Sequence, residues 1–510
     1  MGGQQQSKPI VASEHEKARM RAMRAQEDEY EYIEVGDEKD GRLVTERQAQ
    51  GLPVSVLETW KTNVLKDPKN RLAVTAMNSL NPKQVFKSPA AEQADQQIFN
   101  VRIPFEGAPV TNQRSSGRCW LFASTNVFRV ALMKRYRLAE FELSQAYLFY
   151  WDKIEKANWF LEQVISTAGE DLDGRLVQHL LGDTVSDGGQ WDMVYNLVDK
   201  YGLVPQALYP DNWSAQHTGT LNDVVETKLR EFALRLRAIC RDGAGGAGGA
   251  ASATAVSSAK AEMMREISGV VTLLLGPPPS PDSSFTWEYV DRDGVARSLR
   301  SRPREFARDI ASAELRIDSA VIDSMVSLVN DPRHDRPSLL TVDRLGNVVG
   351  GRAVTYANVD MATLKAACVA MLRAGLPVFF GCDVGQFSDS SSGVMDLDLY
   401  DYELGLAGTG MLRMSKAQRL RTGASAMTHA MVLTAVHVDE DTGQPVRWRV
   451  QNSWGPTPGD KGFFVMTDAW MDEFVYQAVV DQRFLTRDVR QVLGQKPTVL
   501  PVWDPMGSLA

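Results

Sequence analysis

Cys119 lies in the segment of the sequence best suited to nucleophilic chemistry. The surrounding run TNQRSSGRCWLFAS places a Ser-Ser-Gly turn before the cysteine and a helix-periodic apolar stretch after it. A cysteine at the start of a helix faces unpaired backbone N–H groups and the positive end of the helix dipole, and both lower the pKa of its thiol. A lone cysteine is more often an inert buried thiol, so the interpretation of Cys119 as a nucleophile depends on its partners.

His429 is the histidine best placed to act as the base for such a thiol. It begins a strand-like run that His437 ends, and eight residues of strand separate the two by about 26 Å, so they cannot serve one nucleophile or one metal ion. A side chain at the start of a strand can face a cleft, whereas His437 at the far end is interpreted as structural. The other histidines lie in polar, helical or turn segments without a recognisable partner: His15, His179, His217 and His334.

Asn452 and Gln113 are the residues expected to complete the site. Asn452 ends the next strand, VRWRVQN, with the parity of its apolar residues, so it points inward where an antiparallel neighbour can place it beside His429. Its amide oxygen can accept the imidazole N–H and orient the ring. Gln113 precedes Cys119 by six residues, and its amide can join the Cys119 backbone N–H in stabilising an oxyanion. Alone, these would be a turn asparagine and a loop glutamine; their order with Cys119 and His429 indicates a catalytic set.

The motifs around these residues resemble those of the papain family of cysteine peptidases. QRSSGRCWLFAS resembles the family's cysteine motif, and THAMVL and QNSWG resemble its histidine and asparagine motifs. From about Leu52 onward the chain is more specifically similar to the bleomycin hydrolase and aminopeptidase C branch. The segments that carry this likeness are VTNQRSSGRCWLFA, SDGGQWDMVYNLVDKYGLVP, KLREFALRLR, FTWEY, LVNDPR, FFGCDVG and PVWDPMG.

The resemblance implies a fold, an activity and an assembly. The implied fold is a papain-like core with helical insertions, assembled as a homohexamer whose active sites face an internal channel. The implied activity is that of an aminopeptidase acting on peptides with a free N-terminus, and also hydrolysing an amide bond of bleomycin. By the same resemblance, Gly188 and Gly189 let a substrate backbone approach closely, and Trp454 shields the Asn–His hydrogen bond from water.

The C-terminal segment KPTVLPVWDPMGSLA is expected to reach the active site. Its three prolines disfavour a helix and predict an extended arm, which Trp503 would anchor by burying its ring. The α-carboxylate of Ala510 would then pair with the α-ammonium of a substrate. A frayed tail is the ordinary alternative for a chain end, and it is the resemblance of PVWDPMG to the family's ending that favours the arm.

The pattern along the chain predicts an α+β protein of two lobes, a helical lobe followed by a β-sheet lobe. We expect a polar, flexible extension over residues 1–50 and a helical part of the core, with the Cys119 helix, over 51–215. A mainly helical insertion is expected over 216–368, IDSAVIDSMVSLVN included, with a disordered Gly/Ala/Ser tract at 243–260. The β-rich lobe with His429 and Asn452 is assigned to 369–490, and the arm to 491–510.

The composition limits the possible partners and the cellular compartment of the protein. The 510 residues are 44% hydrophobic and carry a formal net charge of −8, which argues mildly against a dedicated nucleic-acid binder. Four cysteines without a CxxC pair favour a reducing compartment. KARMRAMR is Arg-rich, but acidic residues flank it, so a mitochondrial form is the weaker interpretation. The apolar runs are far shorter than the ~20 residues of a membrane helix. We therefore expect a cytoplasmic protein without a membrane partner.

One basic cluster leaves an alternative function, an oligomeric nucleic-acid-binding protein with a secondary peptidase activity. The segment VARSLRSRPREFAR carries Arg297, Arg300, Arg302, Arg304 and Arg308. An ordinary solvated face is the preferred interpretation, and steeply salt-dependent DNA binding would support the alternative. The sequence contains neither GxSxG nor HExxH, and the predicted chemistry requires no metal and no cofactor.

Overall fold

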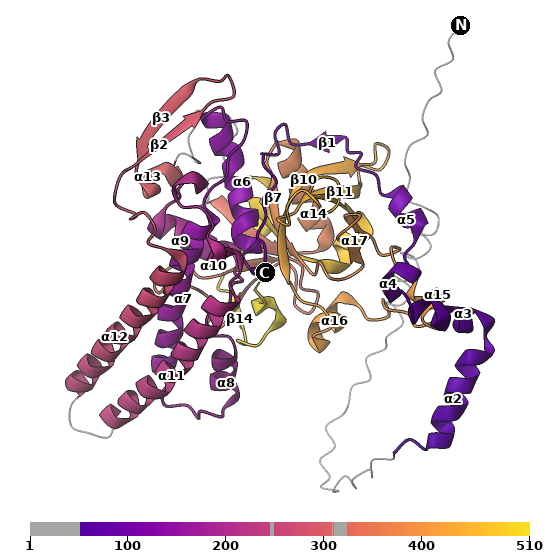
Figure 1. Ribbon diagram of the computed structural model, residues 1–510, viewed down its shortest axis with the longest axis horizontal. Coiled ribbons are helices and arrows are strands. Elements are labelled where there is room, and N and C mark those ends of the chain that lie inside the picture. Colours follow the sequence, from indigo (N-terminus) through magenta and orange to yellow (C-terminus); the bar gives the residue numbers. More distant parts are fainter. Residues whose placement is uncertain (1–50, 245–248, 309, 311–323, 510) are drawn as a thin grey trace. The chain divides into compact units, whose positions relative to one another are not determined.

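The computed structural model describes residues 51–244, 249–308, 310 and 324–509 (Figure 1). The predicted N-terminal extension, residues 1–50, and Ala510 therefore lie outside the described residues. The chain divides into two compact units. The smaller one includes the described residues up to Pro89 together with Tyr400–Arg413 and Val438–Val446, and the larger one consists of Ala90–Leu399, Met414–His437 and the chain from Arg447 onward.

The smaller unit is built from short helices, and the sequence explains where two of them begin. Asp67 and Asn81 each accept a hydrogen bond from a backbone N–H in the first turn, and a proline follows each cap. Neither of the two longest helices buries a residue, and Trp60 is 53% exposed. The helices are α2 (Val54–Lys66), α3 (Pro68–Met77), α4 (Pro82–Val85) and α15 (Tyr402–Gly405).

A large mixed sheet forms the framework for the β-rich part of the chain. Its strands follow the order β14-β5-β6-β4-β13-β7-β10-β11-β12-β9-β8, and β1 also pairs with β10. Strands β4, β7 and β13 are buried along their whole length, as expected for short continuous apolar runs covered on both faces. The strands are β1 (Val101–Arg102), β4 (Met325–Val329), β5 (Ser338–Val342), β6 (Tyr356–Asn358), β7 (Val378–Cys382), β8 (Ser388–Asp389), β9 (Val394–Met395), β10 (His429–Val438), β11 (Pro445–Gln451), β12 (Phe463–Thr467), β13 (Val475–Asp481) and β14 (Thr498–Leu500).

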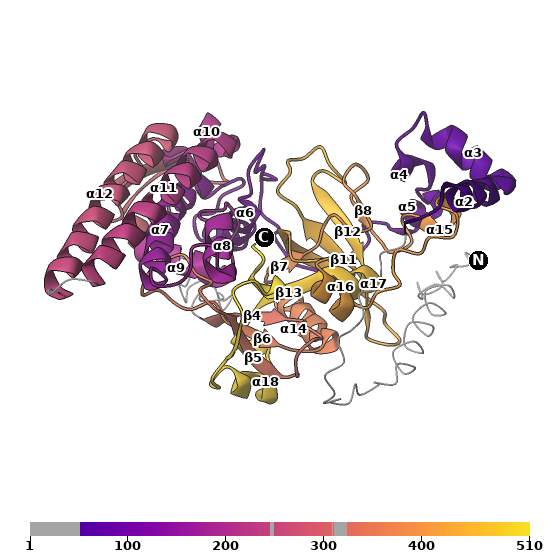
Figure 2. The same cartoon turned by 90° about the horizontal axis from the view of Figure 1, so that it is seen from below.

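Helices of the larger unit form a second layer, in which α6 is the central element. Helix α6 contacts α7, α9 and strand β7, and Trp120, Leu121 and Leu132 on it are completely buried. Helices α7, α11 and α12 run side by side away from the sheet (Figures 1 and 2). The helices of this layer are α6 (Cys119–Arg135), α7 (Gln145–Ser166), α8 (Arg175–Gly182), α9 (Trp191–Tyr201), α10 (Trp213–Gln216), α11 (Gly219–Ala244), α12 (Gly249–Leu275) and α13 (Pro303–Arg308).

The remaining elements of the larger unit are short. They are α5 (Pro89–Ala94), α14 (Met361–Arg373), α16 (Lys416–Thr422), α17 (Asp468–Phe474), α18 (Arg487–Val492), the 3₁₀ turns η1 (Gln206–Leu208), η5 (Gln482–Phe484) and η6 (Pro505–Gly507), and a hairpin of β2 (Phe285–Val290) and β3 (Ala296–Ser301). No helix among the described residues is both long enough and apolar enough to cross a membrane.

The prediction of a disordered tract at residues 243–260 is wrong for most of its length. Helix α11 extends to Ala244 and α12 begins at Gly249, so only residues 245–248 lie outside the described part of the tract. The physical reason is the composition ASATAVSSAK, because alanine is the strongest helix former. Packing of α12 against α11 and α7 then stabilises the pair.

The prediction of a mainly helical insertion over 216–368 is also wrong in its second half. Strands β4, β5 and β6 of the main sheet lie between Met325 and Asn358, and a separate hairpin occupies 285–301. MVSLV, expected to be helical, is strand β4, paired antiparallel with β13. A five-residue apolar run is compatible with a buried strand or with a helical turn, and here its pairing with β13, far along the chain, makes it a strand. The residues before it, 311–323, lie outside the described residues. The α+β class of the chain is as predicted.

Candidate active site

Cys119 is the first residue of α6, and the turn before it is fixed by ion pairing. Arg118 is the N-cap residue of the helix, and its guanidinium is completely buried against Asp211, with Nη1–Oδ1 and Nη2–Oδ2 distances of 3.0 and 2.7 Å. Such a bidentate pair holds both side chains in one geometry. Cys119 itself is 2% exposed. The predicted position of this cysteine at a helix start is therefore what the structure shows.

The electrostatic surroundings of the Cys119 thiol differ from the prediction. Burial is the largest influence and raises its pKa to about 11, although the backbone N–H groups of Ala430, Trp120 and Cys119 each lower it. The helix start thus acts in the predicted direction, but loss of water around the thiolate outweighs it. The contact with Ala430 also places the thiol beside the strand that begins at His429.

His429 is the first residue of β10, and it is bound to Asn452 as predicted. Its Nε2 lies 2.9 Å from Asn452 Oδ1. Because an amide oxygen only accepts hydrogen bonds, Nε2 carries the proton and Nδ1 is the basic nitrogen. Burial lowers the pKa of His429 to about 4, although the Asn452 contact raises it. The imidazole is therefore neutral at physiological pH.

Trp454 covers the His–Asn pair. Its ring centroid lies 4.9 Å from that of His429, with an interplanar angle of 31°. Asn452 is 1% exposed and His429 is 4% exposed. The Oδ1 atom of Asn452 also accepts the backbone N–H of Ser453 at 2.8 Å, which fixes the amide orientation. The structure thus brings together the three residues on the strand side of the site.

Gln113 lies next to the same segment, but its side chain is already engaged at both ends. Its Oε1 accepts from the Ser453 hydroxyl at 2.7 Å, and its Nε2 donates to the Ser116 carbonyl at 2.7 Å. An amide nitrogen has two N–H donors, so one is left for a substrate oxygen. These contacts connect the loop before Cys119 to the chain after Asn452. The role of Gln113 in an oxyanion hole stays a prediction.

The two glycines of the DGGQW segment have contacts within the chain. A Cβ on Gly189 would lie 2.5 Å from the Trp120 indole, so only glycine lets this segment pack against the residue after Cys119. The carbonyl of Gly188 accepts from Lys156 Nζ at 2.5 Å. This packing explains why residue 189 is a glycine, which the sequence alone did not reveal. The predicted approach of a substrate backbone to the two glycines stays a prediction.

The C-terminal segment lies against the residues next to the site. The Ser508 carbonyl accepts from Gln190 Nε2 at 2.7 Å, and the Ser508 hydroxyl donates to the carbonyl of Met427 at 2.8 Å. Gln190 directly follows Gly189, and Met427 precedes His429 by two residues. The structure thus places residue 508 between the two sides of the site.

The predicted anchor of this segment is wrong. Trp503 is 38% exposed. The Arg175 guanidinium stacks over its indole, with Cζ 3.9 Å from the ring centroid. Met506 is the buried apolar residue instead, at 5% exposure, and Asp504 pairs with Arg333 at 2.7 Å. An indole is large and keeps a polar edge, whereas a flexible methionine fills an irregular gap more readily. The segment includes strand β14 and the 3₁₀ turn η6, so it is extended only in part.

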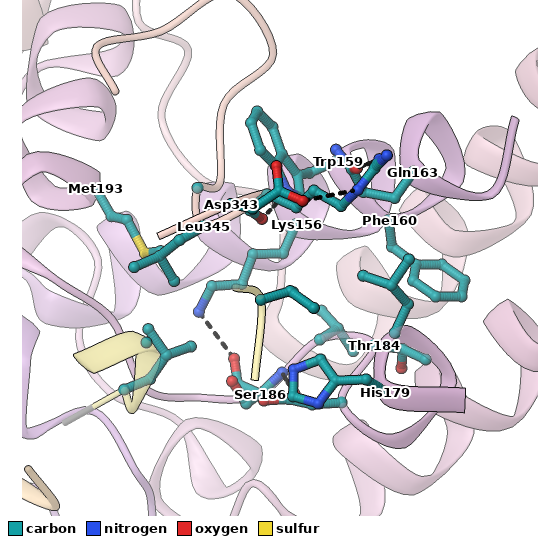
Figure 3. Close-up of a pocket in the computed structure, with 18 residues that line it drawn as sticks. Lys156, Trp159, Phe160, Gln163, His179, Thr184, Ser186, Met193, Asp343 and Leu345 are labelled. Carbon is teal, nitrogen blue, oxygen red and sulfur yellow. Dashed lines mark hydrogen bonds and ion pairs between the residues drawn. The ribbon is translucent and has the colours of Figure 1, made fainter. Parts of the chain in front are cut away.

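A cavity of about 110 Å³ lies beside the end of this segment (Figure 3). It is lined by α7, α8, residues 183–186, residues 343–346, Gly507 and Leu509. Lys156 points into it and donates to the Ser186 carbonyl at 2.9 Å. Neither Cys119 nor His429 lines it. The cavity is therefore separate from the site formed by those two residues.

The arginine cluster behaves as the preferred interpretation expects. Arg297 pairs with Asp291 at 3.1 Å, and Arg304 pairs with Asp282 at 3.3 Å. The Arg304–Asp282 pair is exposed on both sides and has small energetic weight, whereas the half-exposed Arg297 pairs with a carboxylate whose side chain is only 1% exposed. An arginine already paired with a carboxylate is less available for a phosphate. The cluster gives no support to the nucleic-acid alternative.

A buried thiol at a helix start, an imidazole with a free Nδ1 on the neighbouring strand, and an amide that orients the ring define a cysteine peptidase of papain-like architecture. Proton transfer from Cys119 to His429 leaves the net charge of the pair at zero. Burial therefore penalises that transfer far less than it penalises either charge alone.

Comparison with known proteins identifies the family. The chain matches the Peptidase C1-like family over residues 51–507 and belongs to it. It is 42% identical over 475 residues to cysteine proteinase 1, mitochondrial, of Saccharomyces cerevisiae strain JAY291, covering 92% of this chain and 95% of the yeast protein. It is 42% identical over 450 residues to bleomycin hydrolase of Homo sapiens, covering 87% of this chain and 95% of the human protein.

A solved structure gives the same result for the fold. The crystal structure of PepW from Lactobacillus rhamnosis HN001 is similar with a TM-score of 0.83 at 37% identity, covering 90% of this chain and 99% of that one. These comparisons confirm the predicted papain-like fold and the predicted cysteine peptidase of the bleomycin hydrolase branch.

The site also contains buried charged residues that the sequence reasoning missed. Lys153, Lys156 and Asp187 are each at most 8% exposed and lie around the loop before Gly188. Lysine is rarely buried, so no residue pattern indicated the two lysines. The one available signal was the position of Asp187 at the start of DGGQW.

Proposed function

We propose that this cysteine peptidase is an aminopeptidase that cleaves the first peptide bond of substrates with a free N-terminus. The observation that carries the proposal is the position of Ser508, bound to Gln190 on one side and to Met427 on the other. A chain segment there occupies space beside the nucleophile that a longer substrate would need. In the proposed arrangement, it leaves room for only a short N-terminal part of the substrate.

In the proposed mechanism, Cys119 attacks the carbonyl carbon of the first peptide bond while its proton passes to Nδ1 of His429. The oxyanion is bound by the Cys119 backbone N–H and the second N–H of Gln113. His429 then returns the proton to the leaving amine, and a thioester remains on Cys119. Water, deprotonated by His429, hydrolyses that thioester and restores the thiol. Asn452 keeps the imidazole in its productive orientation throughout.

Recognition of the free N-terminus is assigned to the end of the C-terminal segment. Ala510 lies two residues beyond Ser508, and its α-carboxylate is proposed to pair with the substrate's α-ammonium. A charge-assisted contact of this kind is strong where water is excluded. Gly188 and Gly189 are proposed to line the substrate backbone.

The test compares free and N-blocked aminoacyl-coumarin substrates. Wild-type enzyme should cleave the free substrates much faster than the N-blocked ones, and a thiol alkylator should abolish this activity. Deleting the last four residues should admit N-blocked and internal-bond substrates while Cys119 stays reactive. A truncated enzyme that kept its full preference for free amino termini would contradict the proposed role of the segment.

Gln190→Ala provides a finer version of the same test. It removes the donor that holds the Ser508 carbonyl and leaves the chain length unchanged. The preference for free N-termini should weaken in the same direction as in the truncated enzyme, but less. The matched control is Gln163→Ala on α7, whose side chain bonds to Arg344 instead. Its preference should equal that of wild type.

Bleomycin is proposed as a further substrate because of the likeness to human bleomycin hydrolase. Its hydrolysis by wild-type enzyme, and not by Cys119→Ala, would support this proposal. A wild-type enzyme that left bleomycin intact would refute it without affecting the peptidase assignment.

Self-association as a homohexamer is proposed from the same family likeness. The exposed apolar side chains of α2 and α3, Trp60 among them, suit burial by a second copy of the chain. Sedimentation of a single species near 56.5 kDa at micromolar concentration would refute the assembly.

A cytoplasmic location is proposed from the four cysteines without a disulfide pattern. The name of the yeast relative places that protein in mitochondria. Cell fractionation distinguishes the two locations.

A further inference from the structure

Asp187 carries a buried carboxylate that the mechanism above does not use. The residue is 8% exposed. Its Oδ1 lies 2.7 Å from Lys153 Nζ and accepts from Asn222 Nδ2 at 3.0 Å. Its Oδ2 accepts from the Thr218 hydroxyl at 2.5 Å and from the Gly117 backbone N–H at 3.1 Å. Four donors from three segments of the chain hold this carboxylate in a single orientation.

Two contacts of Asp187 fix the chain on either side of Cys119. Its carboxylate accepts the N–H of Gly117, two residues before the cysteine, and its backbone carbonyl accepts the Trp120 indole N–H at 2.6 Å, one residue after it. A Cβ on Gly117 would lie 2.8 Å from the Cβ of Asp187, so the two segments are in direct contact. Asp187 therefore holds the chain on both sides of the thiol, in addition to the Arg118–Asp211 pair at the helix start.

The carboxylate of Asp187 is ionised. Burial alone would raise its pKa, but the Lys153 ammonium and the hydrogen bonds from Thr218 and Gly117 outweigh burial and hold the pKa well below its usual range. The other charged groups nearby are paired with one another: Lys156 with Asp152 on α7, and Arg118 with Asp211 at the start of α6. Asp187 and Lys153 thus form a buried ion pair beside the nucleophile.

We propose that Asp187 is a positioning residue, which fixes the Cys119 thiol relative to the Gly188–Gly189 segment, the segment proposed above to line the substrate. The inference rests on the proposed role of Cys119 as nucleophile and adds a determinant of its placement. The Asp187 charge also acts on the thiol, because it raises the pKa of Cys119. Cys382 on β7 is a further titratable group that interacts with that thiol, and it lies opposite His429 in the pairing of β7 with β10.

Asp187→Asn tests the proposal because it keeps the shape of the side chain and removes its charge. We expect kcat to fall about 10- to 100-fold with a smaller change in KM, as a displaced reacting group would cause. Losing the negative charge favours the thiolate and disfavours the imidazolium, so both limbs of the kcat/KM pH profile should move to lower pH. Loss of a buried charge remote from the thiol would not move these limbs.

Asp481→Asn is the matched control. Asp481 is 1% exposed and pairs with Arg483 at 2.9 Å, outside the residues assigned to catalysis. This variant should lose stability but keep the wild-type kcat and pH profile. Thr218→Val removes one hydrogen bond to Asp187 without changing charge, so it should lower kcat less and leave the limbs in place.

The inference is overturned if Asp187→Asn loses no more kcat than Asp481→Asn, or if its pH limbs stay in place. Should Asp187→Asn not fold, the kcat of Thr218→Val decides, and a kcat equal to that of wild type overturns the inference. Activity in Cys119→Ala would refute the proposed function itself. An inactive Cys119→Ala beside a normal Asp187→Asn refutes this inference alone.

Discussion

Replacing Gly189 by alanine should damage both stability and activity, although it adds a single methyl group. The new Cβ would lie 2.5 Å from the Trp120 ring. Ordinary carbon–carbon contact needs about 3.5 Å, so the two segments must move apart by about 1 Å. Trp120 is completely buried, and its indole N–H is bound to the Asp187 carbonyl, so the ring has no free space to enter. Overpacking of this kind costs about 1–3 kcal/mol in the free energy of unfolding.

The same displacement reaches the nucleophile, because Trp120 directly follows Cys119 in α6. A shift of about 1 Å at a reacting group lowers the rate about 100-fold. Urea unfolding measures the stability change, and kcat/KM on a free aminoacyl-coumarin measures the activity.

Gly169→Ala is the matched control, because a Cβ at Gly169 meets nothing within 4 Å. It should stay within about 0.5 kcal/mol of wild type and keep full activity. If Gly189→Ala behaved like this control, the packing argument would be refuted.

Three further predictions concern the catalytic residues. Cys119→Ala should keep the fold and lose several orders of magnitude in rate, and iodoacetamide should label Cys119 faster than the other three cysteines; labelling at equal rates would contradict an activated thiol. Asn452→Ala should retain more activity than His429→Ala, because asparagine orients the base and histidine transfers the proton; the reverse order would exchange their roles. His429 should cost the fold about 3 kcal/mol between pH 7 and pH 4, since its pKa falls from 6.5 to about 4 on folding and the unfolded chain gains the proton first. Urea unfolding of wild type and His429→Gln at both pH values isolates this contribution, and equal pH dependence would mean that folding does not lower the pKa of His429.

The parts of the site that the sequence predicted are those set by local pattern. Cys119 follows a turn and starts an apolar helix, and His429 and Asn452 lie at the ends of neighbouring strands with clear alternation. Each position follows from a period of 3.6 or 2 residues over a short window. Only the pairing of β10 with β11 was needed to bring His429 and Asn452 together.

The features that were missed depend on tertiary contacts. Strand β4 is distinguished from a helix only by its pairing with β13, about 150 residues later in the chain. The high pKa of Cys119 arises from burial by several elements, which no local motif encodes. In the same way, Lys153 and Asp187 become an ion pair only when α7 meets the loop before Gly188.

The sheet order has a consequence for synthesis of the chain. Strand β7, whose Cys382 lies opposite His429, has β10 on one side and β13 on the other, and β13 ends at Asp481. Contacts of such long sequence separation form late, and a chain emerging from the ribosome cannot make them until both partners are available. Most of the chain must therefore have been translated before thiol and imidazole can meet. A growing chain would carry the Cys119 helix for some 300 residues without a working base, and so would not cleave its neighbours.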